Sequence, residues 1–359
     1  MSMSIYRLLI PFWLLQLFVA PLFAQQSYYS SINGVRGGAP LKSALCELVG
    51  LHNRISYGTG KNSVWWAFYV TDAVEGNKKQ VADIYSHTPR YFTDRGSSVA
   101  GMHIEHCVPK SWWGGDKNDA YCDLHHLFPA DASANIRKSN KPLGNLVDVS
   151  WTNGAASIGK ALIEDSLQAA FEPCDEYKGD FARAYMYIFT CYQDFEWEHT
   201  AMNYKSSAYP TIKPWAVELL LDWHAKDPVS AKEKERNELV YAIQNNRNPF
   251  VDYPNLVDYV WGDSIAYTYT LPCVNGNPPK ENNALSCLLS SDSRKRPEYL
   301  CSLPYMLQKA DGQECAAAAL INVYSMTGFL ILDSVTYGEA LNALPPGLYM
   351  VDNRKFIVY

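Results

Sequence analysis

The sequence predicts an α+β fold, with a helix-rich domain followed by a small β module at the C-terminal end. Three observations support this fold class. Several segments carry apolar residues at the three- and four-residue spacing of amphipathic helices. Shorter stretches between them are rich in β-branched and aromatic residues, which is typical of strands. A segment rich in proline, asparagine and serine then separates the larger part of the chain from the last strands, as linkers do.

Composition limits the class of protein. The 359 residues are 48% hydrophobic and 19% charged, enough for a sizeable core in one large domain with an appendage. Lys and Arg number 31 against 37 Asp and Glu, which gives a formal net charge of −6. This charge excludes a protein that binds nucleic acid through an overall basic surface. An acidic substrate would have to be held by a local basic patch or by a metal ion.

The N-terminus has the pattern of a secretory signal peptide, residues 1–24. One charge, Arg7, precedes an apolar run that ends at Ala24, where a signal peptidase can cut. An uncleaved membrane anchor fits less well, because Pro11 and Pro21 interrupt a run that is short for a span. No other apolar run is long enough to cross a bilayer. We therefore expect a protein that is secreted, periplasmic or on the cell surface, with no membrane span in its mature chain.

Export would permit disulfide bonds, and the chain has nine cysteines, an odd number. Cys107 and Cys122 flank one loop, and Cys174 and Cys191 bracket another segment, so either pair could close a small loop. Spacing does not assign connectivity, and buried free thiols are the alternative.

The large domain, residues 25–267, contains the amphipathic segments. Its first helix begins at Pro40, since proline suits the first helical turn, and one face carries Leu41, Leu45, Leu48 and Val49. Next we expect extended segments at Val64–Val70 and Val81–Tyr85. Further helices are expected around Ile163, Leu167 and Ala170, over Phe181–Tyr192, around Trp215, Leu219, Leu220 and Trp223, and over Lys232–Ile243. A linker, residues 268–314, and the β module, residues 315–359, complete the chain.

Residues 101–145 carry the candidate chemistry. Met102–His106 alternates as a strand does, and a loop with two glycines follows. Asp123–Phe128 can form a second strand, which the next residue, a proline, would stop. Asp131 suits the N-cap of a short helix through Asn140. A strand, loop, strand and helix in this order can bring side chains from all of these elements together.

Three side chains of this segment suit the cleavage of phosphodiesters. The carboxylate of Glu105 and the side-chain carbonyl of Asn135 offer oxygen ligands, which a hard cation such as Mg²⁺ prefers. The neutral imidazole of His106 can deprotonate an attacking water, and the metal would neutralise charge on the phosphate and the leaving oxygen. Neighbours on a strand point to opposite faces, so Glu105 and His106 need a bulge or a strand end at Cys107–Pro109.

The segment resembles the bacterial endonuclease I family of secreted non-specific nucleases, which have a His-Me finger (ββα-metal) site. The resemblance covers roughly residues 40–262, in the blocks LKSALCELVGLHNRISYG, SVWWAFYVTD, EHCVPKSWWGGDKNDAYCDLHHLFPADASANIRKSNKPLG and AIQNNRNPFVDYP. It implies a helix-rich nuclease domain built around that motif, with one Mg²⁺ for which Mn²⁺ or Ca²⁺ can substitute. It also implies cleavage of DNA and RNA to 5′-phosphate ends.

The resemblance further implies residue roles. Glu105 and Asn135 match the family's metal ligands, and His106 matches its general base. An arginine in this family steadies the scissile phosphate, and Arg137 is the candidate here. The chain departs from the family at His126, where the family usually has Asn or a similar residue, and this affects the expected role of the second strand.

We expect two more basic residues to bind substrate, Lys138 and Arg247. Lys138 belongs to a basic cluster just after Asn135. For Arg247, which follows the charged helix, the alternative is a structural role in a helix C-terminal turn that Pro249 stops.

Other side chains in the segment 101–145 have more than one interpretation. His103, Glu105 and His125 could share a face of the strand pair and hold zinc. Asp123 could orient a histidine, or be an ordinary carboxylate at a strand end. The pair Trp112–Trp113 could stack on bases, although core packing is the commoner role of adjacent aromatic residues.

The last residues have a resemblance of their own. INVYSMTGFLIL and LPPGLYMVDNRKFIVY are similar to the C-terminal sorting domain of the type IX secretion system, and a plain β-hairpin cap is the alternative. The resemblance implies that the tail is an address, recognised by the secretion machinery and removed on export.

Together these patterns predict a secreted, Mg²⁺-dependent endonuclease without sequence specificity, acting on DNA and RNA. Two rival hypotheses remain. One is a zinc-dependent hydrolase of another phosphoester or of an amide, which would co-purify with stoichiometric zinc. The other is a nucleic-acid-binding surface protein whose site has decayed, which would bind without cleaving under any metal.

Overall fold

The computed structural model describes residues 25–198, residues 201–272 and four strands between residues 321 and 358. The chain divides into two compact units, Met1–Gly276 and Asn277–Tyr359. The predicted signal peptide and nearly all of the predicted linker lie outside the described residues. The predicted domain boundaries therefore stay predictions.

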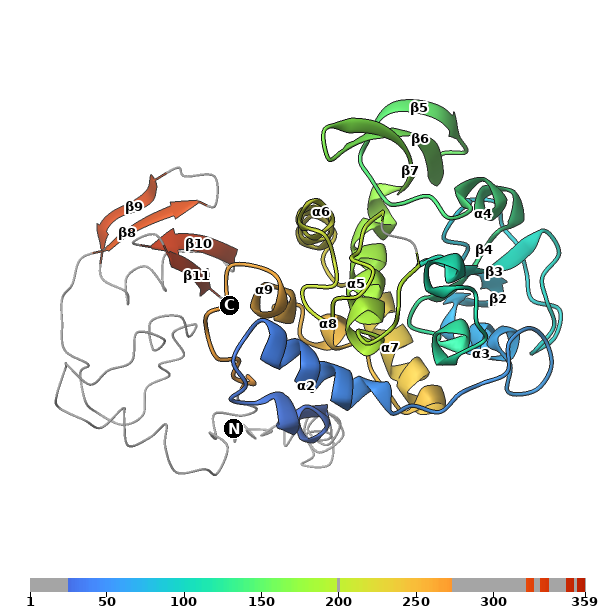
Figure 1. The fold of residues 1–359 in the computed structure, drawn as a ribbon, viewed down its shortest axis with the longest axis horizontal. Helices are drawn as coiled ribbons and strands as arrows, with labels where there is room; N and C mark the ends of the chain where they lie inside the picture. Colours follow the sequence, from blue (N-terminus) through green and yellow to red (C-terminus); the bar gives the residue numbers. More distant parts are fainter. Residues whose placement is uncertain are drawn as a thin grey trace, which may run out of the picture. The chain divides into compact units, whose positions relative to one another are not determined.

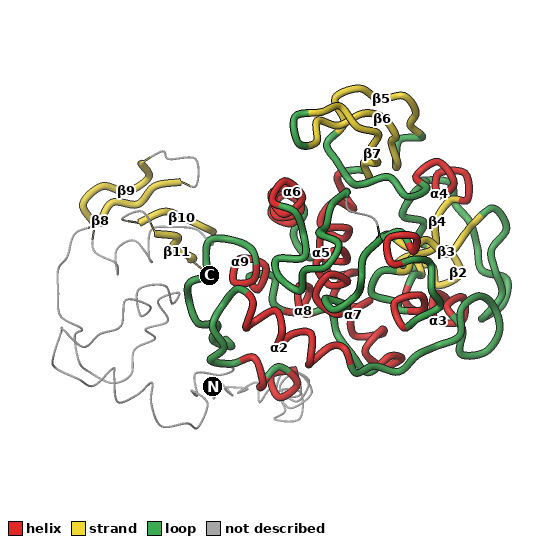
Figure 2. Tube along the Cα trace, viewed as in Figure 1, coloured by secondary structure: helices red, strands yellow, loops and turns green. Residues whose placement is uncertain are grey.

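The first unit mixes helices with small antiparallel sheets, which confirms the predicted α+β class (Figures 1 and 2). Its helices are α2 (Ala39–Gly50), α3 (Val64–Thr71), α4 (Ala132–Lys138), α5 (Asp175–Cys191), α6 (Pro214–Lys226), α7 (Ala231–Gln244), α8 (Pro249–Asp252) and α9 (Leu256–Val260). Its strands are β1 (Ala73–Val74), β2 (Asn77–Val81), β3 (Met102–His106), β4 (Leu127–Asp131), β5 (Leu146–Thr152), β6 (Ala156–Ile163) and β7 (Ser166–Pro173). Short 3₁₀ turns are η1 (Ser30–Ile32), η2 (Lys110–Trp113) and η3 (Asp119–Cys122).

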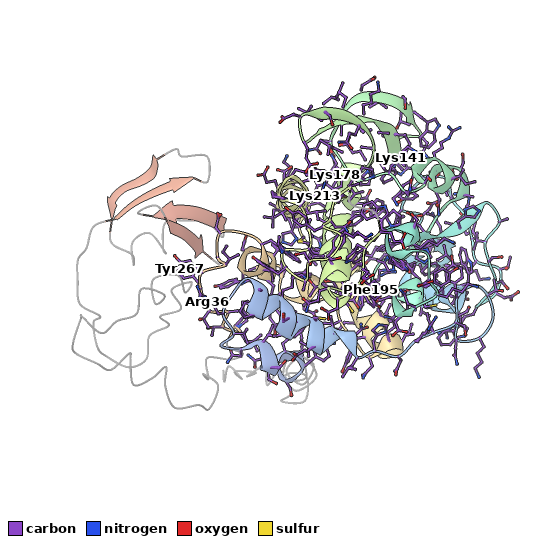
Figure 3. All side chains as sticks on the ribbon, in the orientation of Figure 1. Arg36, Lys141, Lys178, Phe195, Lys213 and Tyr267 are labelled. Atoms are coloured by element: carbon purple, nitrogen blue, oxygen red, sulfur yellow. The ribbon has the colours of Figure 1, made fainter. Side chains whose placement is uncertain are left out.

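Helix α5 lies at the centre of the first unit (Figure 1). Every residue from Phe181 to Cys191 is buried, which is the pattern of a helix covered on all sides. Helices α2 and α6 pack against α5, and side chains fill the space between the helices (Figure 3). The predicted helices that correspond to α2, α5, α6 and α7 are confirmed. In the described part of the chain, no helix is long and apolar enough to span a membrane.

The predicted extended segment Val64–Val70 is wrong, because these residues form helix α3. The side chain of Ser63 accepts a hydrogen bond from the amide of Trp66 and so caps the helix. The run is apolar on every face, so periodicity could not distinguish a buried helix from a buried strand. The second predicted segment, Val81–Tyr85, is also wrong beyond its first residue, since β2 ends at Val81.

The predicted helix around Ile163, Leu167 and Ala170 is wrong as well, because these residues lie in the β6–β7 hairpin. Glu164 and Asp165 form its two-residue turn, with φ values of 47° and 62°. Positive φ at both central residues is the geometry that a tight hairpin requires. The two turn residues are not glycine or asparagine, so the usual sequence signal for such a turn was missing.

The hairpin β3–β4 and helix α4 carry the candidate site. Strand β3 has its predicted bounds, and Asp131 caps α4 by accepting a hydrogen bond from the amide of Ala134. The predicted second strand, Asp123–Phe128, is shifted, because β4 begins only at Leu127. Pro129 does not stop the strand but lies within it, as a two-stranded sheet allows, since each strand is an edge.

The described cysteines are free thiols, so neither predicted disulfide is present. They are Cys46, Cys107, Cys122, Cys174 and Cys191. The alternative of buried free thiols fits Cys107, Cys122 and Cys191, which are buried in the core.

The second unit contains a four-stranded antiparallel sheet in the order β11-β10-β8-β9. The strands are β8 (Ile321–Ser325), β9 (Leu330–Val335), β10 (Gly347–Val351) and β11 (Arg354–Val358). They lie in the stretches where the sequence predicts short strands with turns. This sheet is compatible both with a sorting domain and with a plain β cap.

Candidate active site

The carboxylate of Glu105 is buried between the β3–β4 hairpin and helix α4, with 4% of the residue exposed. Its Oε1 accepts a hydrogen bond from the Tyr85 hydroxyl at 3.0 Å and lies 2.7 Å from Nζ of Lys138. Both contacts fall on Oε1, so among the described residues Oε2 is left for a further ligand. Burial raises the pKa of Glu105, and Lys138 and Tyr85 oppose this rise by stabilising the carboxylate.

His106 is the last residue of β3, and its ring is enclosed by other aromatic rings. Its Nε2 lies 3.1 Å from the carbonyl oxygen of Tyr121. Because a carbonyl only accepts, Nε2 carries the proton and Nδ1 is the basic nitrogen. The Tyr57 ring stacks on the imidazole at 5.6 Å, with 17° between the planes. Burial is the main cause that lowers the pKa of His106 well below its usual range, and the neighbouring His126 adds to this effect. The His106 ring is therefore neutral at pH 7.

Strand β3 ends directly after the consecutive residues Glu105 and His106, and their side chains contact different elements. The strand ends at His106, and after it the amide of Cys107 bonds the carbonyl of His126. Glu105 contacts α4 through Lys138, whereas His106 contacts the 3₁₀ turn η3. The predicted strand end is therefore present, and it allows both side chains to be buried.

Helix α4 brings Asn135 to the same region. Asn135 precedes Lys138 by three residues, so the two lie on the same side of the helix, and Lys138 contacts Glu105 from that side. Asn135 is half-buried, and among the described residues nothing hydrogen-bonds its side-chain amide. Its carbonyl is therefore available as a ligand.

Arg137 is exposed on α4 and contacts the β5–β6–β7 sheet instead of Glu105 or His106. Its guanidinium carbon lies 4.9 Å from the centre of the Trp151 ring. Lys141, which follows α4 (Figure 3), donates a hydrogen bond to the main-chain carbonyl of Arg137. The structure therefore does not place Arg137 with the other predicted catalytic residues.

The two residues predicted to bind substrate are not accessible. The side chain of Lys138 is 1% exposed and is paired with Glu105. Arg247 donates two hydrogen bonds of 2.6 Å to Glu238 and lies 3.4 Å from Asp252. Its alternative interpretation fits better, because Asn245 ends α7 in the left-handed conformation just before it. Both predicted substrate contacts are corrected to structural ion pairs.

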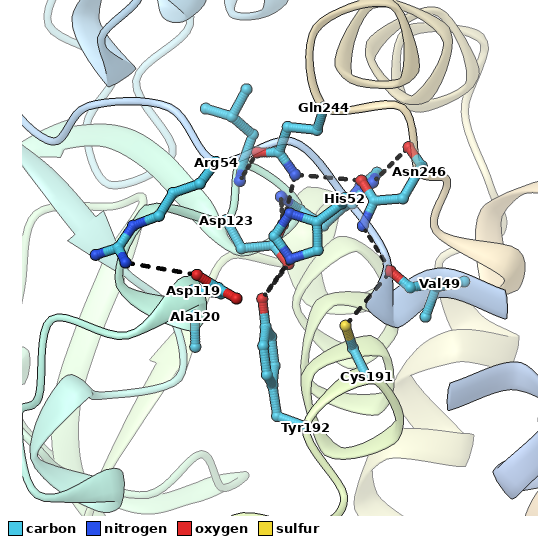
Figure 4. Close-up of polar contacts among 12 residues, drawn as sticks. Val49, His52, Arg54, Asp119, Ala120, Asp123, Cys191, Tyr192, Gln244 and Asn246 are labelled. Carbon is cyan, nitrogen blue, oxygen red and sulfur yellow. Dashed lines mark hydrogen bonds and ion pairs between the residues drawn. The ribbon is translucent and has the colours of Figure 1, made fainter. Parts of the chain in front are cut away.

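A buried network around Asp123 holds the loop that contacts His106 (Figure 4). Asp123 is fully buried, and its oxygens accept four hydrogen bonds of 2.8 to 3.0 Å. The donors are the amide of His125, the side-chain amide of Gln244 and the hydroxyls of Tyr187 and Tyr192. The preceding turn η3 supplies the main-chain carbonyls of Tyr121 and Ala120, which bond the rings of His106 and His126. Asp123 thus anchors this loop from the core.

The electrostatics of this network favour an ionised Asp123. Burial acts to raise the pKa of Asp123, but the nearby histidines His52, His125 and His126 outweigh it and hold the pKa below its usual range. Burial in turn lowers the pKa of His125 and of His126 to about 4, so both rings are neutral at pH 7. Each of these two rings bonds a main-chain carbonyl, which makes them packing residues of the core.

One trio in the described residues could hold a metal ion, and it differs from the predicted zinc set. Ligand atoms of His52, Asp123 and Cys191 all lie within 4.8 Å of one another (Figure 4). A nitrogen, oxygen and sulfur set suits zinc, not Mg²⁺. However, the four hydrogen bonds to Asp123 already occupy its oxygens, so an ion would have to displace them. The predicted set of His103, Glu105 and His125 is not brought together, since His103 is exposed and His125 bonds Asn246.

Several functional neighbours were not singled out from the sequence. Tyr57, Tyr85 and Tyr121 surround the site, and Gln244 supports Asp123. Tyr57 and Gln244 stand inside the sequence blocks that resemble the family, which is the signal that could have found them. The pair Trp112–Trp113 is buried in the core, so the packing interpretation holds and the base-stacking one is wrong.

Comparison with known proteins gives a consistent family. The chain matches the Endonuclease I family over residues 37–255. It is 32% identical to an extracellular ribonuclease of Bacillus amyloliquefaciens over 246 residues, 68% of this chain and 81% of that protein. It is 25% identical to an extracellular deoxyribonuclease of Aeromonas hydrophila, over 49% of this chain and 76% of that protein. It is also 27% identical to Endonuclease-1 of Buchnera aphidicola, over 48% of this chain and 68% of that protein.

Proposed function

The chain belongs to the endonuclease I family and is an endonuclease, and we propose that it is a secreted, Mg²⁺-dependent enzyme without sequence specificity. In this proposal it hydrolyses DNA and RNA to products with 5′-phosphate ends. The names of two relatives, an extracellular ribonuclease and an extracellular deoxyribonuclease, support both substrates and secretion. The observation that carries the proposal is the buried pair Glu105 and His106 at the end of β3, beside α4.

His106 acts as the general base in this proposal. The Tyr121 carbonyl holds the proton on Nε2, which leaves the lone pair of Nδ1 to accept a proton from the attacking water. Burial keeps the ring neutral, so the basic form is already present at neutral pH. The stacked Tyr57 ring fixes the plane of the imidazole.

Glu105 and Asn135 would hold the Mg²⁺ ion in a His-Me finger built from β3, β4 and α4. The residues fit the ion, because Oε2 of Glu105 and the amide oxygen of Asn135 are hard oxygen donors without a hydrogen-bond or ion-pair partner among the described residues. When bound, the ion neutralises charge on the scissile phosphate and on the leaving oxygen. Lys138 stabilises the carboxylate of Glu105 and so opposes the effect of its burial on the pKa. Arg137 is exposed on α4 and remains our candidate for contact with the scissile phosphate.

We also propose the organisation of the whole chain. Residues 1–24 would be a signal peptide, 25–267 the catalytic domain, 268–314 a linker and 315–359 a type IX sorting signal. The extracellular relatives support export. The sequence similarity of the tail supports the sorting role.

Metal-dependent plasmid cleavage tests the proposal. Wild-type protein is expected to nick and linearise plasmid DNA with Mg²⁺ and to lose this activity in EDTA. Glu105→Ala and Asn135→Ala should need much higher Mg²⁺ concentrations, since each removes a ligand. Lys79→Ala changes an exposed residue of β2 and serves as the control. Full activity in EDTA, or an unchanged Mg²⁺ requirement in both ligand variants, would overturn the metal assignment.

A further inference from the structure

A basic groove is lined in part by the residues that follow Tyr57, whose ring stacks on His106. The groove has a volume of about 540 Å³ and is lined by Lys61, Arg95 and Trp66 together with small and hydroxyl residues. No carboxylate lines it, although the chain as a whole carries a net charge of −6. A polyanion approaching this acidic protein would find a locally favourable potential there.

The floor of the groove is built from two backbone segments held close together. The amide of Gly60 donates a hydrogen bond of 2.8 Å to the carbonyl of Gly96. Gly96 has φ of +94°, and a Cβ there would lie 2.8 Å from the carbonyl oxygen of Gly60. Only glycine at position 96 allows both this backbone conformation and this close approach. The groove is therefore a fixed feature of the surface.

The arginine of the groove is held in place by its neighbours. The guanidinium carbon of Arg95 lies 3.4 Å from the centre of the Trp66 ring, and its Nε bonds the Trp66 carbonyl. Stacking on an aromatic ring leaves the outer edge of a guanidinium free for a phosphate. Across the groove, the side chain of Lys61 is exposed. Two cations thus line one groove, and one of them is already oriented.

The groove is continuous in sequence with the catalytic residue. Tyr57 stacks on His106, and Thr59 to Lys61, only a few residues later, line the groove. Four residues span at most about 14 Å, which limits the distance from Tyr57 to Lys61. One strand of a duplex rises about 3.4 Å per nucleotide, so phosphates a few nucleotides away from the one that is cut can reach the groove.

We infer that this groove is a subsite for the phosphate backbone of the polynucleotide, and that Lys61 and Arg95 bind phosphates flanking the one that is cut. The inference rests on the proposed function only in taking a polynucleotide as the substrate. The contacts are to phosphate and not to bases, so they serve a non-specific nuclease.

Binding without metal tests this inference separately from cleavage. A fluorescein-labelled 16-mer of single-stranded DNA is titrated in EDTA with the wild type and with Lys61→Ala/Arg95→Ala, at several salt concentrations. We expect the variant to bind on the order of tenfold more weakly at low salt, with a salt slope shallower by about 1 to 2. The matched control is Lys78→Ala/Lys79→Ala, which removes two exposed charges of β2 outside the groove. Lys61→Glu keeps the contact between Arg95 and Trp66 and should weaken binding as well.

Two further results decide the matter. Cleavage of bis(p-nitrophenyl) phosphate with Mg²⁺ should be unchanged in the groove variants, because this small diester does not reach the groove. The inference is overturned if both groove variants bind the 16-mer like the wild type, or if the Lys78/Lys79 control loses as much affinity and salt slope. Failure of the proposed function would instead appear as an absence of Mg²⁺-dependent cleavage in the wild type.

Discussion

At the scale of single residues, the site depends on burial that has opposite consequences for two neighbouring side chains. Burial raises the pKa of Glu105, and the ammonium of Lys138 compensates by stabilising the carboxylate. The same burial lowers the pKa of His106 and keeps it neutral. Lys138 thus favours the charged carboxylate that a metal ligand needs, and burial favours the neutral imidazole that a general base needs.

The pH dependence of cleavage should show the lowered pKa of His106. Protonation removes the base, so kcat/KM falls as the pH falls through this pKa, and the acid limb should lie below pH 6.5. Tyr57→Ala exposes the His106 ring, so the acid limb of this variant should move up towards pH 6.5. Tyr57→Phe keeps the stacking and should keep the wild-type profile. The pH profiles of the three proteins check this, and an acid limb at the same pH in all three would contradict it.

The ion pair between Lys138 and Glu105 should be essential for the stability of the metal-free fold. Lys138→Met leaves a buried carboxylate without its partner, which should lower the free energy of unfolding by about 3–5 kcal/mol. Urea unfolding in EDTA measures this loss, with Lys79→Met at an exposed position as the control. Added Mg²⁺ should restore part of the loss, because the ion replaces the missing positive charge. Equal stability of the two variants would contradict the account.

At the scale of elements, the hairpin, α4 and the η3 loop are held by different parts of the core. Asp123 ties the loop to α5 through Tyr187, to the C-cap of α5 through Tyr192, and to α7 through Gln244. The loop in turn presents the Tyr121 carbonyl to His106. Asp123 therefore holds in place the loop that contacts His106, the residue that we propose as the base.

Asp123→Asn should weaken the fold in a pH-dependent way. The pKa of Asp123 is lower in the folded protein than in the unfolded chain, so its charge stabilises the fold above the unfolded pKa, about 4. That contribution is lost as the pH falls towards the folded pKa. The difference in Tm between wild type and variant should thus be large at pH 7 and smaller at pH 3. A Tm difference that does not change with pH would argue against this role of the charge.

The N-cap of α3 should contribute measurably to stability. Ser63 is fully buried, and its hydroxyl both accepts from the Trp66 amide and donates to the Gly60 carbonyl. Ser63→Ala should cost about 1 kcal/mol, whereas Ser63→Thr should keep most of the cap. Chemical denaturation of the two variants measures the difference. Equal stability of Ser63→Ala and the wild type would contradict the capping role.

How far the sequence predicts these elements depends on the local signals. The amphipathic helices α2, α5, α6 and α7 and the cap of α4 were predictable, because apolar spacing and capping residues agree there. Helix α3 was not, because its apolar run has no polar face. The β6–β7 hairpin was not either, because its turn residues, Glu164 and Asp165, are unusual at positive φ.

The candidate site was predictable only in part for similar reasons. Glu105, His106 and Asn135 could be chosen by chemistry and resemblance, because their residue types fit the reaction. The pairing of Lys138 with Glu105 and of Arg247 with Glu238 depends on contacts distant in sequence, which composition does not reveal. Basic residues near a catalytic motif can thus be structural.

At the scale of the whole molecule, the net charge of −6 is compatible with a nucleic-acid substrate. An acidic protein can bind a polyanion where cations are concentrated, and the groove of Lys61 and Arg95 is such a place. The same charge limits tight, metal-free binding, which suits an enzyme that must release its products.

The first compact unit should fold and act without the second. A protein of residues 25–276 retains every residue of the candidate site and the core around α5. We expect its Tm and its specific nuclease activity to match those of the protein that includes residues 277–359. Thermal unfolding and plasmid cleavage of the two proteins check this. A loss of folding on truncation would contradict the proposed division of the chain.

The central claim is that His106 is the base of a metal-dependent phosphodiester cleavage. The most direct measurement is the rate of Mg²⁺-dependent plasmid nicking by His106→Ala, with Lys79→Ala at an exposed position of β2 as the control. We expect a loss of at least about two decades in rate for His106→Ala, with an unchanged far-UV circular dichroism spectrum, and a near wild-type rate for Lys79→Ala. A wild-type rate in folded His106→Ala would contradict it.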